Sequence, residues 1–469
     1  METLGILSVV PPVLAVVLAM ATRNVYVALF LGCYSAYSIL AGNPLTGMVD
    51  TLNSFVNVFT GSSNTIVIFS LLMIGGIILL INKSGGIEGF VQFAVHKKSL
   101  IKSRKGAQIF SWVIGVLIFT SGTLHCLVAG TIARPISDAF KVSHEKLTFI
   151  VRTTSTPVCV LLPLSGWGAF MIGLLQAQDV AEPVSVLARS IPLNFYCLIA
   201  VLSVPVLILL GRDFSKMKTA EERARSTGLL DRKPREDVKV DTGYGDAGKA
   251  SSMWNMVAPL GGLILMILVA LFVTGRGNLL EGSGMQALLW GCSFAVLVAG
   301  ILYVAQRLMT VGQFLDNFFK GSGNMIGMAA ILMLAFSLGA VVKQLETGKY
   351  LADLFKDALS PGMLPLLIFL ISCAISFSTG TSMGTMTVMS AIALPLAVGV
   401  EGNIPLAFAA LVGGSIFGDH SSPISDTAIL SCSSCGCDLM DHVTSQLPYT
   451  LTIAAVTMVI YLGVGMAFF

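Results

Sequence analysis

Ten consecutive residues, Gly418 to Thr427 (GDHSSPISDT), carry more chemistry than any other stretch of this chain. They hold two acids, one histidine, four hydroxyls and a proline in a sequence that is 55% hydrophobic. Ionisable groups within apolar segments are costly and are functional candidates by default. We expect Asp419 to be a cation ligand or proton carrier, with Asp426 second, or alternatively Asp419 caps a half-helix. His420 either titrates near neutral pH or hydrogen-bonds a local carbonyl.

A second polar stretch, VRTTSTPVCVLLPLSGW, lies at residues 151–167 and contains no acid. An arginine beside hydroxyls suits a carboxylate or another anionic group. The alternatives are that Arg152 is the partner of an acid elsewhere, such as Asp138, or lies near a helix start with its charge reaching toward the surface. The predicted solute-binding residues of this half of the site are Arg152, Thr153, Thr154, Ser155, Ser165, Ser121, Gly122 and Thr123, with His420 from the other stretch.

Three cysteines in CSSCGC, Cys432, Cys435 and Cys437, precede an Asp–His pair with a spacing that resembles a metal site. The end of a membrane helix explains small residues there equally well, and the sequence has no second cluster of paired ligands. The other six cysteines stand singly in apolar segments and are expected to be small core residues. We therefore expect no metal beyond sodium and leave the role of the three cysteines open.

The elements that must position these residues are membrane helices. Only 11% of the residues are charged and the mean hydropathy is +0.85, which predicts an integral membrane protein. The balanced charge gives no reason to expect a nucleic-acid partner. The first apolar run lacks the features of a removable signal peptide, so we expect it to span. The predicted spans are 4–21, 25–42, 64–82, 189–210, 254–274, 285–305, 324–343 and 446–468.

Four other apolar regions do not fit a simple crossing. Segments 145–178 and 404–433 are too long for one span and are interrupted by proline and polar residues, which predicts helices broken near the middle of the membrane. Segments 107–140 and 361–398 each bend at a Gly–Thr pair, which predicts re-entrant hairpins. Inside a membrane, a break survives only where protein or a wet cavity satisfies the backbone groups that it frees.

An internal repeat relates the two halves of the chain. At a shift of 260 residues GSSN (61–64) matches GSGN (321–324), and IARP (132–135) matches IALP (392–395). Ser155, Pro163 and Ser165 match Ser415, Pro423 and Ser425, and the hairpin tips match at a shift of 258. Each half crosses the membrane an odd number of times, so the two copies must have opposite orientations.

The predicted fold is therefore an all-α polytopic membrane protein with two inverted-topology repeats. Each repeat has about five spanning helices, one of them broken, and a re-entrant hairpin. Residues 1–210 form the first repeat, 211–253 a polar solvated linker and 254–469 the second repeat. Most basic residues lie on the linker's side, so the positive-inside rule predicts a cytoplasmic linker.

The segments GGSIFGDHSSPISDTAIL, STGTSMGTM and ARPISDAFKVSHEKLTFIV resemble the NhaC-type sodium/proton antiporters of the ion transporter superfamily. The resemblance covers nearly the whole chain outside the linker. It implies a homodimer that works by an elevator motion in a bacterial or archaeal inner membrane. The ion-binding residues that it implies are Asp419, Ser421, Ser422, Asp426, Thr379, Gly380 and Thr381.

The first repeat departs from this family pattern. Many members carry acids at the first hairpin tip and at the start of the first break, where this chain has residues 121–125 and Arg152. We therefore expect coupling of a sodium or proton gradient to a small carboxylate-bearing solute, a carboxylic or amino acid, with sodium/proton antiport as the alternative. An enzyme is not expected, because HExxH is absent and the one GxSxG match, GTSMG at 380–384, is part of the predicted hairpin tip in an apolar segment. No nucleotide-binding motif or organic cofactor is indicated, and a passive channel fits two converging breaks less well.

Overall fold

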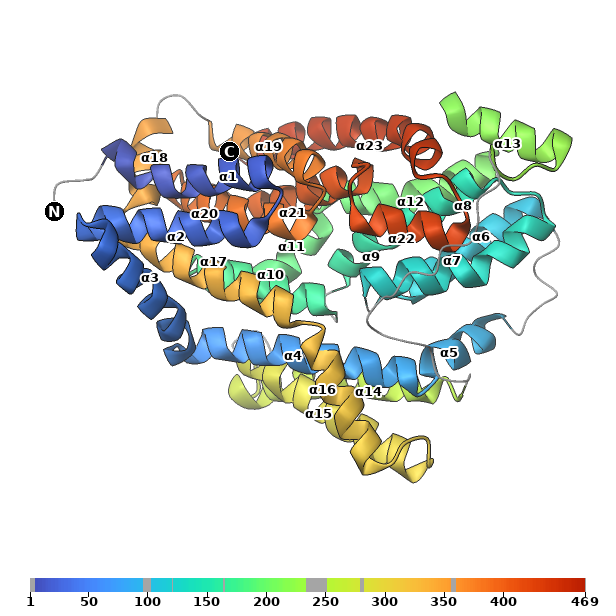
Figure 1. Cartoon of the computed structure of the whole chain (residues 1–469), viewed down its shortest axis with the longest axis horizontal. Coiled ribbons are helices and arrows are strands. Elements are labelled where there is room, and N and C mark those ends of the chain that lie inside the picture. Colours follow the sequence, from blue (N-terminus) through green and yellow to red (C-terminus); the bar gives the residue numbers. More distant parts are fainter. Residues whose placement is uncertain are drawn as a thin grey trace.

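The computed structural model describes residues 5–95, 103–119, 121–162, 165–232, 251–278, 282–355 and 360–468. Every regular element in these ranges is a helix (Figure 1). Seven of the described helices are long and apolar enough to cross a membrane, and two bent pairs raise the number to as many as nine. The prediction of an all-α polytopic membrane protein is confirmed.

The described part of the first repeat contains twelve α-helices. They are α1 (Val10–Thr22), α2 (Val25–Ala41), α3 (Pro44–Asn57), α4 (Ser62–Lys83), α5 (Gly86–Val95), α6 (Arg104–Leu117), α7 (Gly122–Ala139), α8 (His144–Thr154), α9 (Thr156–Leu161), α10 (Gly166–Ala177), α11 (Pro183–Ser190) and α12 (Phe195–Leu210).

The linker contributes α13 (Ser215–Thr227), and the second repeat follows it. Its helices are α14 (Trp254–Thr274), α15 (Gly284–Ala305), α16 (Val311–Gly323), α17 (Ile326–Gln344), α18 (Thr347–Phe355), α19 (Leu364–Thr379), α20 (Ser382–Gly399), α21 (Ile404–Ser421), α22 (Asp426–Cys435) and α23 (Leu439–Phe468).

The starts of equivalent helices lie 260 residues apart. This holds for α7 and α20, for α8 and α21, and for α10 and α22. The hairpin tips were matched at a shift of 258 in the sequence, but the helices align them at 260. The residue equivalent to Ser121 is therefore Thr381, and both are the N-cap residues of their helices.

Two hairpins enter from opposite ends of the long axis, as oppositely oriented repeats require (Figure 1). The α6–α7 hairpin occupies the right half of the view and the α19–α20 hairpin the left half. Gly380 ends α19 with φ +70°, a left-handed conformation that favours glycine. Each tip thus turns within a few residues and starts a new helix near the middle of the molecule.

Both long segments are broken, as the sequence predicts. The first is helical to Thr154, turns at Ser155 and ends as α9 before α10 begins. The second stops at Ser421 and resumes at Asp426. Pro423 lies in this second gap, where its missing N–H prevents a continuous helix. Its counterpart, Pro163, lies outside the described residues.

Several helices were not expected from the sequence, namely α3, α5, α11, α16 and α18. They are short and carry polar residues on one face, so they fall below the length and apolarity that identify a span. The sequence does contain a recognisable signal for the start of one of these helices, α16. Thr310 and Gln313 form a reciprocal capping box at the beginning of α16.

The linker is not wholly solvated, and this corrects the expectation for its first part. Helix α13 packs against α8 and α23. Glu221 is 3% exposed, pairs with Arg104 at 2.7 Å and accepts the amide N–H of Ser143 at 2.9 Å. Arg223 pairs with Glu145 on α8 at 2.8 Å. These pairs dock residues 215–227 on the first repeat, while 233–250 lie outside the described residues.

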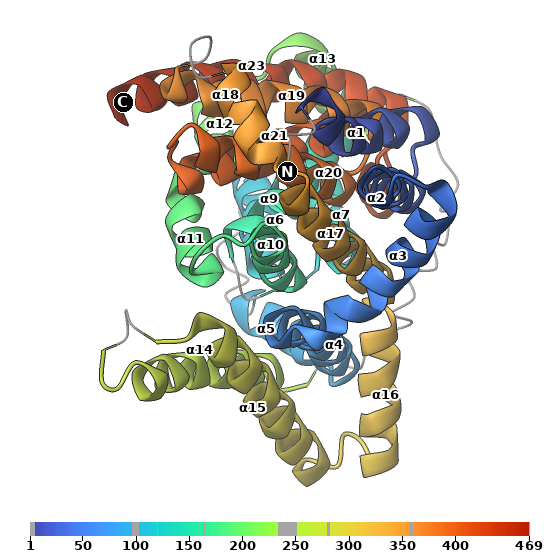
Figure 2. The same cartoon turned by 90° about the vertical axis from the view of Figure 1, so that its left-hand side faces the viewer.

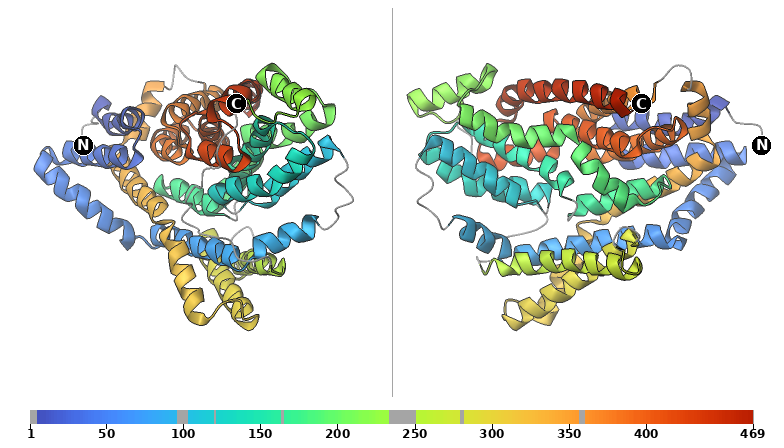
Figure 3. Two further views of the ribbon diagram at one scale, coloured as in Figure 1. Left: turned by 45° about the vertical axis from the view of Figure 1, so that its right-hand side comes forward. Right: turned by 180° about the vertical axis from the view of Figure 1, so that it is seen from behind.

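Helices α14, α15 and α16 project from one side of the molecule and connect to the rest through α4 (Figures 2 and 3). The crossing of α4 and α16 depends on small residues. A Cβ atom at Gly75 would lie 2.6 Å from the carbonyl oxygen of Gly321. Close backbone approach of this kind is how helices pack tightly within membranes. The start of α17, next to α16, lines a cavity near the centre of the molecule that is described below.

Candidate functional site

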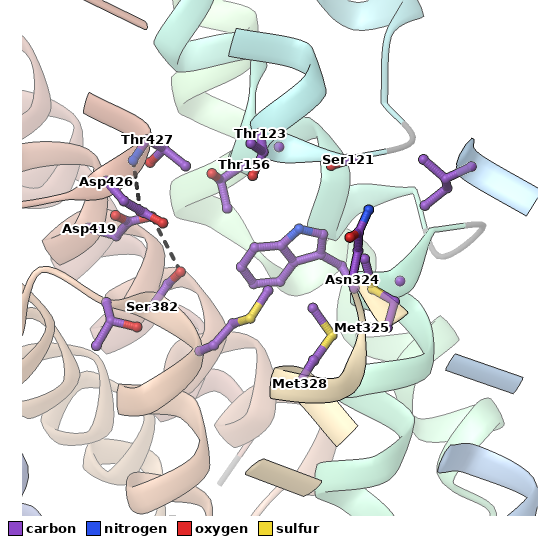
Figure 4. Close-up of a pocket in the computed structure, with 16 residues that line it drawn as sticks. Ser121, Thr123, Thr156, Asn324, Met325, Met328, Ser382, Asp419, Asp426 and Thr427 are labelled. Atoms are coloured by element: carbon purple, nitrogen blue, oxygen red, sulfur yellow. Dashed lines mark hydrogen bonds between the residues drawn. The ribbon is translucent and has the colours of Figure 1, made fainter. Parts of the chain in front are cut away.

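Four helices begin at one central cavity of about 350 Å³. They are α7 and α10 of the first repeat and α20 and α22 of the second, so the cavity joins both hairpin tips and both breaks. Figure 4 shows Asp419 and Asp426 on one side and Ser121 and Thr123 of the first hairpin tip on another. The lining residues are Ile78, Ser121, Gly122, Thr123, Thr156, Gly166, Trp167, Asn324, Met325, Met328, Thr381, Ser382, Met383, Asp419, Asp426 and Thr427.

The four helix N-termini direct partial positive charge toward the cavity. Three of them have a side-chain cap: Ser165 accepts an N–H of α10, Thr381 one of α20 and Ser425 one of α22. The fourth, α7, begins at Ser121, whose side chain makes no capping bond. The first turn of α7 therefore presents backbone N–H groups without a side-chain acceptor.

The two acids of the second break occupy different environments. Asp419 is 4% exposed and accepts hydrogen bonds from Ser425 at 2.5 Å and Ser382 at 3.3 Å. Asp426 is exposed and accepts the amide N–H of Thr427 at 2.7 Å through one oxygen. Asp419 is thus held by protein groups, whereas Asp426 is accessible at the cavity wall.

Arg152 lies behind the cavity and binds the second break. Its guanidinium donates to the carbonyl oxygen of Asp419 at 2.5 Å, to Ser425 at 2.9 Å and to Thr427. Its Nη2 also lies 3.7 Å from the Asp419 carboxylate. The side chain is almost fully buried and is not among those that line the cavity. The first repeat therefore contributes the positive charge that faces Asp419.

Carbonyl groups freed by the second break are occupied by protein donors. Arg152 takes the carbonyl of Asp419, and Gln446 on α23 donates to that of His420 at 2.5 Å. Two hydroxyls expected to bind the cation are also engaged. Ser421 donates to Thr450, and Ser422 donates to the carbonyl of Phe377. At the second hairpin, Thr379 bonds its own helix and Gly380 turns the chain, leaving Thr381 at the cavity.

The predicted solute-binding residues also divide into some that line the cavity and others that bond to protein groups elsewhere. Ser121, Gly122 and Thr123 line the cavity. The others make contacts outside its lining: Thr153 lies 3.3 Å from His420, Thr154 lies 3.3 Å from His125, Ser155 donates to the carbonyl of Gly122, Ser165 caps α10, and His420 Nδ1 lies 2.9 Å from the Tyr196 hydroxyl.

Several lining residues were missed from the sequence. Trp167, Met325 and Met328 form an apolar part of the wall, and Asn324 adds an amide. The repeat contained the signal for two others, because Ser382 is equivalent to Gly122 and Gly166 to Asp426 at the shift of 260. Asn324 ends the GSGN motif by which the repeat was recognised.

Cys432, Cys435 and Cys437 are buried and form no disulfide. Among the described residues, no three His, Cys, Asp or Glu side chains are grouped so that they could hold a metal ion. Desolvation stabilises the neutral thiol, which suits small residues packed at the end of α22.

The fold resembles that of a solved transporter. The YdaH transporter of Alcanivorax borkumensis, described as having an unusual topology, aligns with a TM-score of 0.57 at 14% identity, covering 94% of this chain and 98% of that one. At this identity the likeness concerns the fold alone.

Several curated proteins are similar in sequence, and two of them are described here. An uncharacterised protein of Haemophilus influenzae is 31% identical over 98% of this chain and 91% of its own length. The arginine/ornithine antiporter ArcD of Halobacterium salinarum is 24% identical over 47% of this chain and 44% of its own. The model of the Na+/H+ antiporter family matches residues 158–466, which include both acids and all but the last three residues of the second repeat. The sequence resemblance is confirmed, and this multi-pass membrane protein belongs to the Na+/H+ antiporter family.

Proposed function

We propose that this protein couples a sodium or proton gradient to the movement of a small carboxylate-bearing organic solute, a carboxylic or amino acid. The observation that carries the proposal is a single cavity in which an accessible acid and an uncapped helix N-terminus face the same space. The acid suits a cation and the N-terminus suits an anion. No organic cofactor takes part, and we propose transport rather than catalysis.

The cation side of the cavity is the second repeat. Arg152 offsets the charge of Asp419, so Asp426 is left as the acid without a cationic partner in the described wall. One monovalent cation at Asp426 would neutralise the cavity. Oxygen ligands of the kind sodium prefers are available from Asp426, Ser382 and Thr381. Ser382 would link the cation to Asp419, because its hydroxyl donates a hydrogen bond to the Asp419 carboxylate.

The solute side is the first repeat. The N–H groups at the start of α7 and the hydroxyls of Ser121 and Thr123 would bind a carboxylate, and Trp167 with Met325 and Met328 would pack against its carbon chain. The guanidinium of Arg152 is committed to α21 and α22. We therefore assign Arg152 to positioning the second break rather than to binding the solute.

Two further observations bear on this proposal. A relative named as an arginine/ornithine antiporter exchanges solutes that each carry a carboxylate, which supports an organic solute. Sodium/proton antiport remains the second candidate, favoured by the family's description and by the accessible carboxylate of Asp426.

The cavity lies between two groups of helices. Ile78, Asn324, Met325 and Met328 come from α4 and the α16–α17 junction, and the other lining residues come from the hairpins and the broken helices. Relative movement of the two groups would expose the cavity to each side in turn, which is an elevator-type alternating access. We further propose a homodimer in a bacterial or archaeal inner membrane, with the linker in the cytoplasm.

The first experiment is a thermal-shift screen of the purified protein against carboxylic and amino acids, with and without sodium. We expect a carboxylate-bearing solute whose stabilisation is larger when sodium or acid is present. Stabilisation by sodium alone, with no organic ligand, would instead support antiport.

The variant that tests the cation role is Asp426→Asn. It should abolish cation-dependent transport in proteoliposomes, because the only unpaired carboxylate of the described cavity wall becomes neutral. The matched control is Asp441→Asn, since Asp441 is half-buried, pairs with Arg232 at 3.8 Å and lies away from the cavity. Normal sodium dependence of Asp426→Asn would remove the assignment.

A further inference from the structure

His125 on α7 is completely buried, and both of its ring nitrogens face backbone carbonyl oxygens. Nδ1 lies 2.9 Å from the carbonyl oxygen of Ile118, just after the end of α6. Nε2 lies 2.9 Å from the carbonyl oxygen of Val151 on α8. The ring thus bridges the first hairpin and the helix that enters the first break.

A carbonyl oxygen can only accept a hydrogen bond, so each of these contacts requires an N–H on the ring. A neutral imidazole has one N–H, and only the imidazolium has two. The bridge is therefore complete when His125 carries an extra proton, and incomplete when it does not. Burial disfavours the cation, while two charge-assisted hydrogen bonds favour it, so the two effects oppose each other.

A second arrangement is available for the neutral ring. The hydroxyl of Thr154 lies 3.3 Å from Nε2 and also within reach of the carbonyl oxygen of Ile150, at 2.9 Å. With His125 neutral, Thr154 can rotate its proton from that carbonyl to Nε2. With His125 protonated, Nε2–H donates to Val151 and Thr154 donates to Ile150. Both states satisfy the ring, and they differ by one contact to α8.

His125 is joined directly to the cavity wall. Its amide N–H makes the first helical hydrogen bond of α7, to the carbonyl oxygen of Ser121 at 2.8 Å. Ser121 and Gly122 line the cavity, and Ser155 on the turn after α8 donates to the carbonyl of Gly122. A change in the contact between His125 and α8 would therefore move the start of α7 relative to the first break.

No charged side chain contacts the ring among the described residues. On the α6 side it faces the backbone of Gly115 and of Ile118, which follows α6, and from α8 it contacts the backbone at Val151 and the hydroxyl of Thr154. The nearest charge along α8 is Arg152, whose guanidinium binds the second break. The protonation of His125 is therefore governed by its burial together with these carbonyls and this hydroxyl.

We infer that His125 is a proton-binding site that couples the first hairpin to the first broken helix. One proton from hydronium adds to Nε2 and leaves water, the Nε2–H bond to Val151 forms, and release returns that proton to water as hydronium. The inference deepens the proposed function, because it names a proton as a coupling ion and α7, the proposed carboxylate site, as the element that it controls.

The test is nitrogen NMR of the five histidines, labelled in the ring and observed in lipid over a range of pH. The His125 signals are those that disappear in His125→Gln. We expect them to change from a two-proton ring at acidic pH to a one-proton ring as the pH rises. A one-proton ring at every pH at which the protein stays folded would overturn the inference.

Thr154→Val provides a second variant that does not remove the histidine. It deletes the hydroxyl that serves only the neutral ring, so the titration midpoint should move to higher pH. An unchanged midpoint would contradict the two-state arrangement. His420 is the internal control, because its ring nitrogens face the hydroxyls of Tyr196 and Thr153 and need only one proton.

This measurement does not depend on a solute. If His125 titrates as expected and the screen finds no organic ligand, the proton site stands and the proposed solute function fails. If a solute binds and His125 does not titrate, the reverse holds.

Discussion

The first break, before Gly166, and the second, before Asp426, occupy equivalent places but satisfy their open backbone groups differently. In the first repeat the carbonyl of Cys159, which is equivalent to Asp419, accepts a hydrogen bond from Ser165 of the same repeat at 3.3 Å. In the second, the carbonyl of Asp419 meets Arg152, which comes from the other repeat. One break is closed within its own copy, and the other is held across the interface between copies.

This difference explains how two copies of the same repeat can bind different ligands. The second break holds two acids, and Arg152 of the first repeat places one positive charge beside Asp419. Its wall therefore carries one net negative charge, at Asp426. The first break holds no acid, and the hairpin tip of the same repeat starts α7 at Ser121 without a side-chain cap. The same fold thus offers a cation-binding wall on one side of the cavity and an anion-binding wall on the other.

The largest expected effect comes from removing the positive charge of Arg152, which the first repeat contributes to the second break. Arg152→Met should lower the free energy of unfolding by about 3–5 kcal/mol, because Asp419 would remain buried without its cationic partner. The double variant Arg152→Met/Asp419→Asn should recover most of this loss, since no buried charge is left, while cation-dependent transport stays absent. Thermal unfolding of the four proteins forms a double-mutant cycle. Additive losses would show that the two residues are not coupled and that the second break is held by other contacts.

Much of the fold was predictable because the interruptions of membrane helices have strong sequence signals. Glycine, proline, serine and threonine at the hairpin tips and breaks mark where helices stop, and the repeat confirmed these places by recurrence. The short helices α3 and α16 were missed, because amphipathic segments of that length do not reach the apolarity of a span.

The site was predictable only in part, for a physical reason. The sequence indicated that Asp419, Asp426 and the first hairpin tip carry chemistry, and these residues line the cavity. It could not indicate that Arg152 would use its donors on the carbonyl of Asp419 and on Ser425, because that pairing arises only when the two repeats are packed together. For the same reason Trp167 gave no signal, since a tryptophan in an apolar helix is usually packing.

A smaller effect separates the two N-cap serines at equivalent positions. Ser165 caps α10 and otherwise bonds neighbouring carbonyls, so Ser165→Ala should cost about 1 kcal/mol, as usual for a lost cap. Ser425 caps α22 and also bonds Asp419 and Arg152, so Ser425→Ala should cost about 2 kcal/mol or more. Chemical or thermal unfolding measures both. Equal losses would mean that the charged network adds nothing to the second break.

The smallest expected effect comes from making the first break resemble the second. Gly166 is equivalent to Asp426, and a Cβ atom there would meet its nearest neighbours, Leu71 and Met325, at 3.7 Å, which is ordinary contact. Gly166→Asp should therefore fold and add a second acid to the cavity. Repulsion should weaken binding of a carboxylate solute about tenfold, or about 1.4 kcal/mol, and should strengthen cation binding.

The control for this substitution is Gly166→Asn, which adds the same bulk without charge. Ligand titrations of both variants, at low and high salt, separate the two contributions, because screening reduces a charge effect and leaves a steric one. If Gly166→Asn weakens the solute as much as Gly166→Asp, the loss reflects space rather than charge. The division of the cavity into a cation wall and an anion wall would then lose its electrostatic basis, and the asymmetry of the two breaks would concern only how each helix end is held.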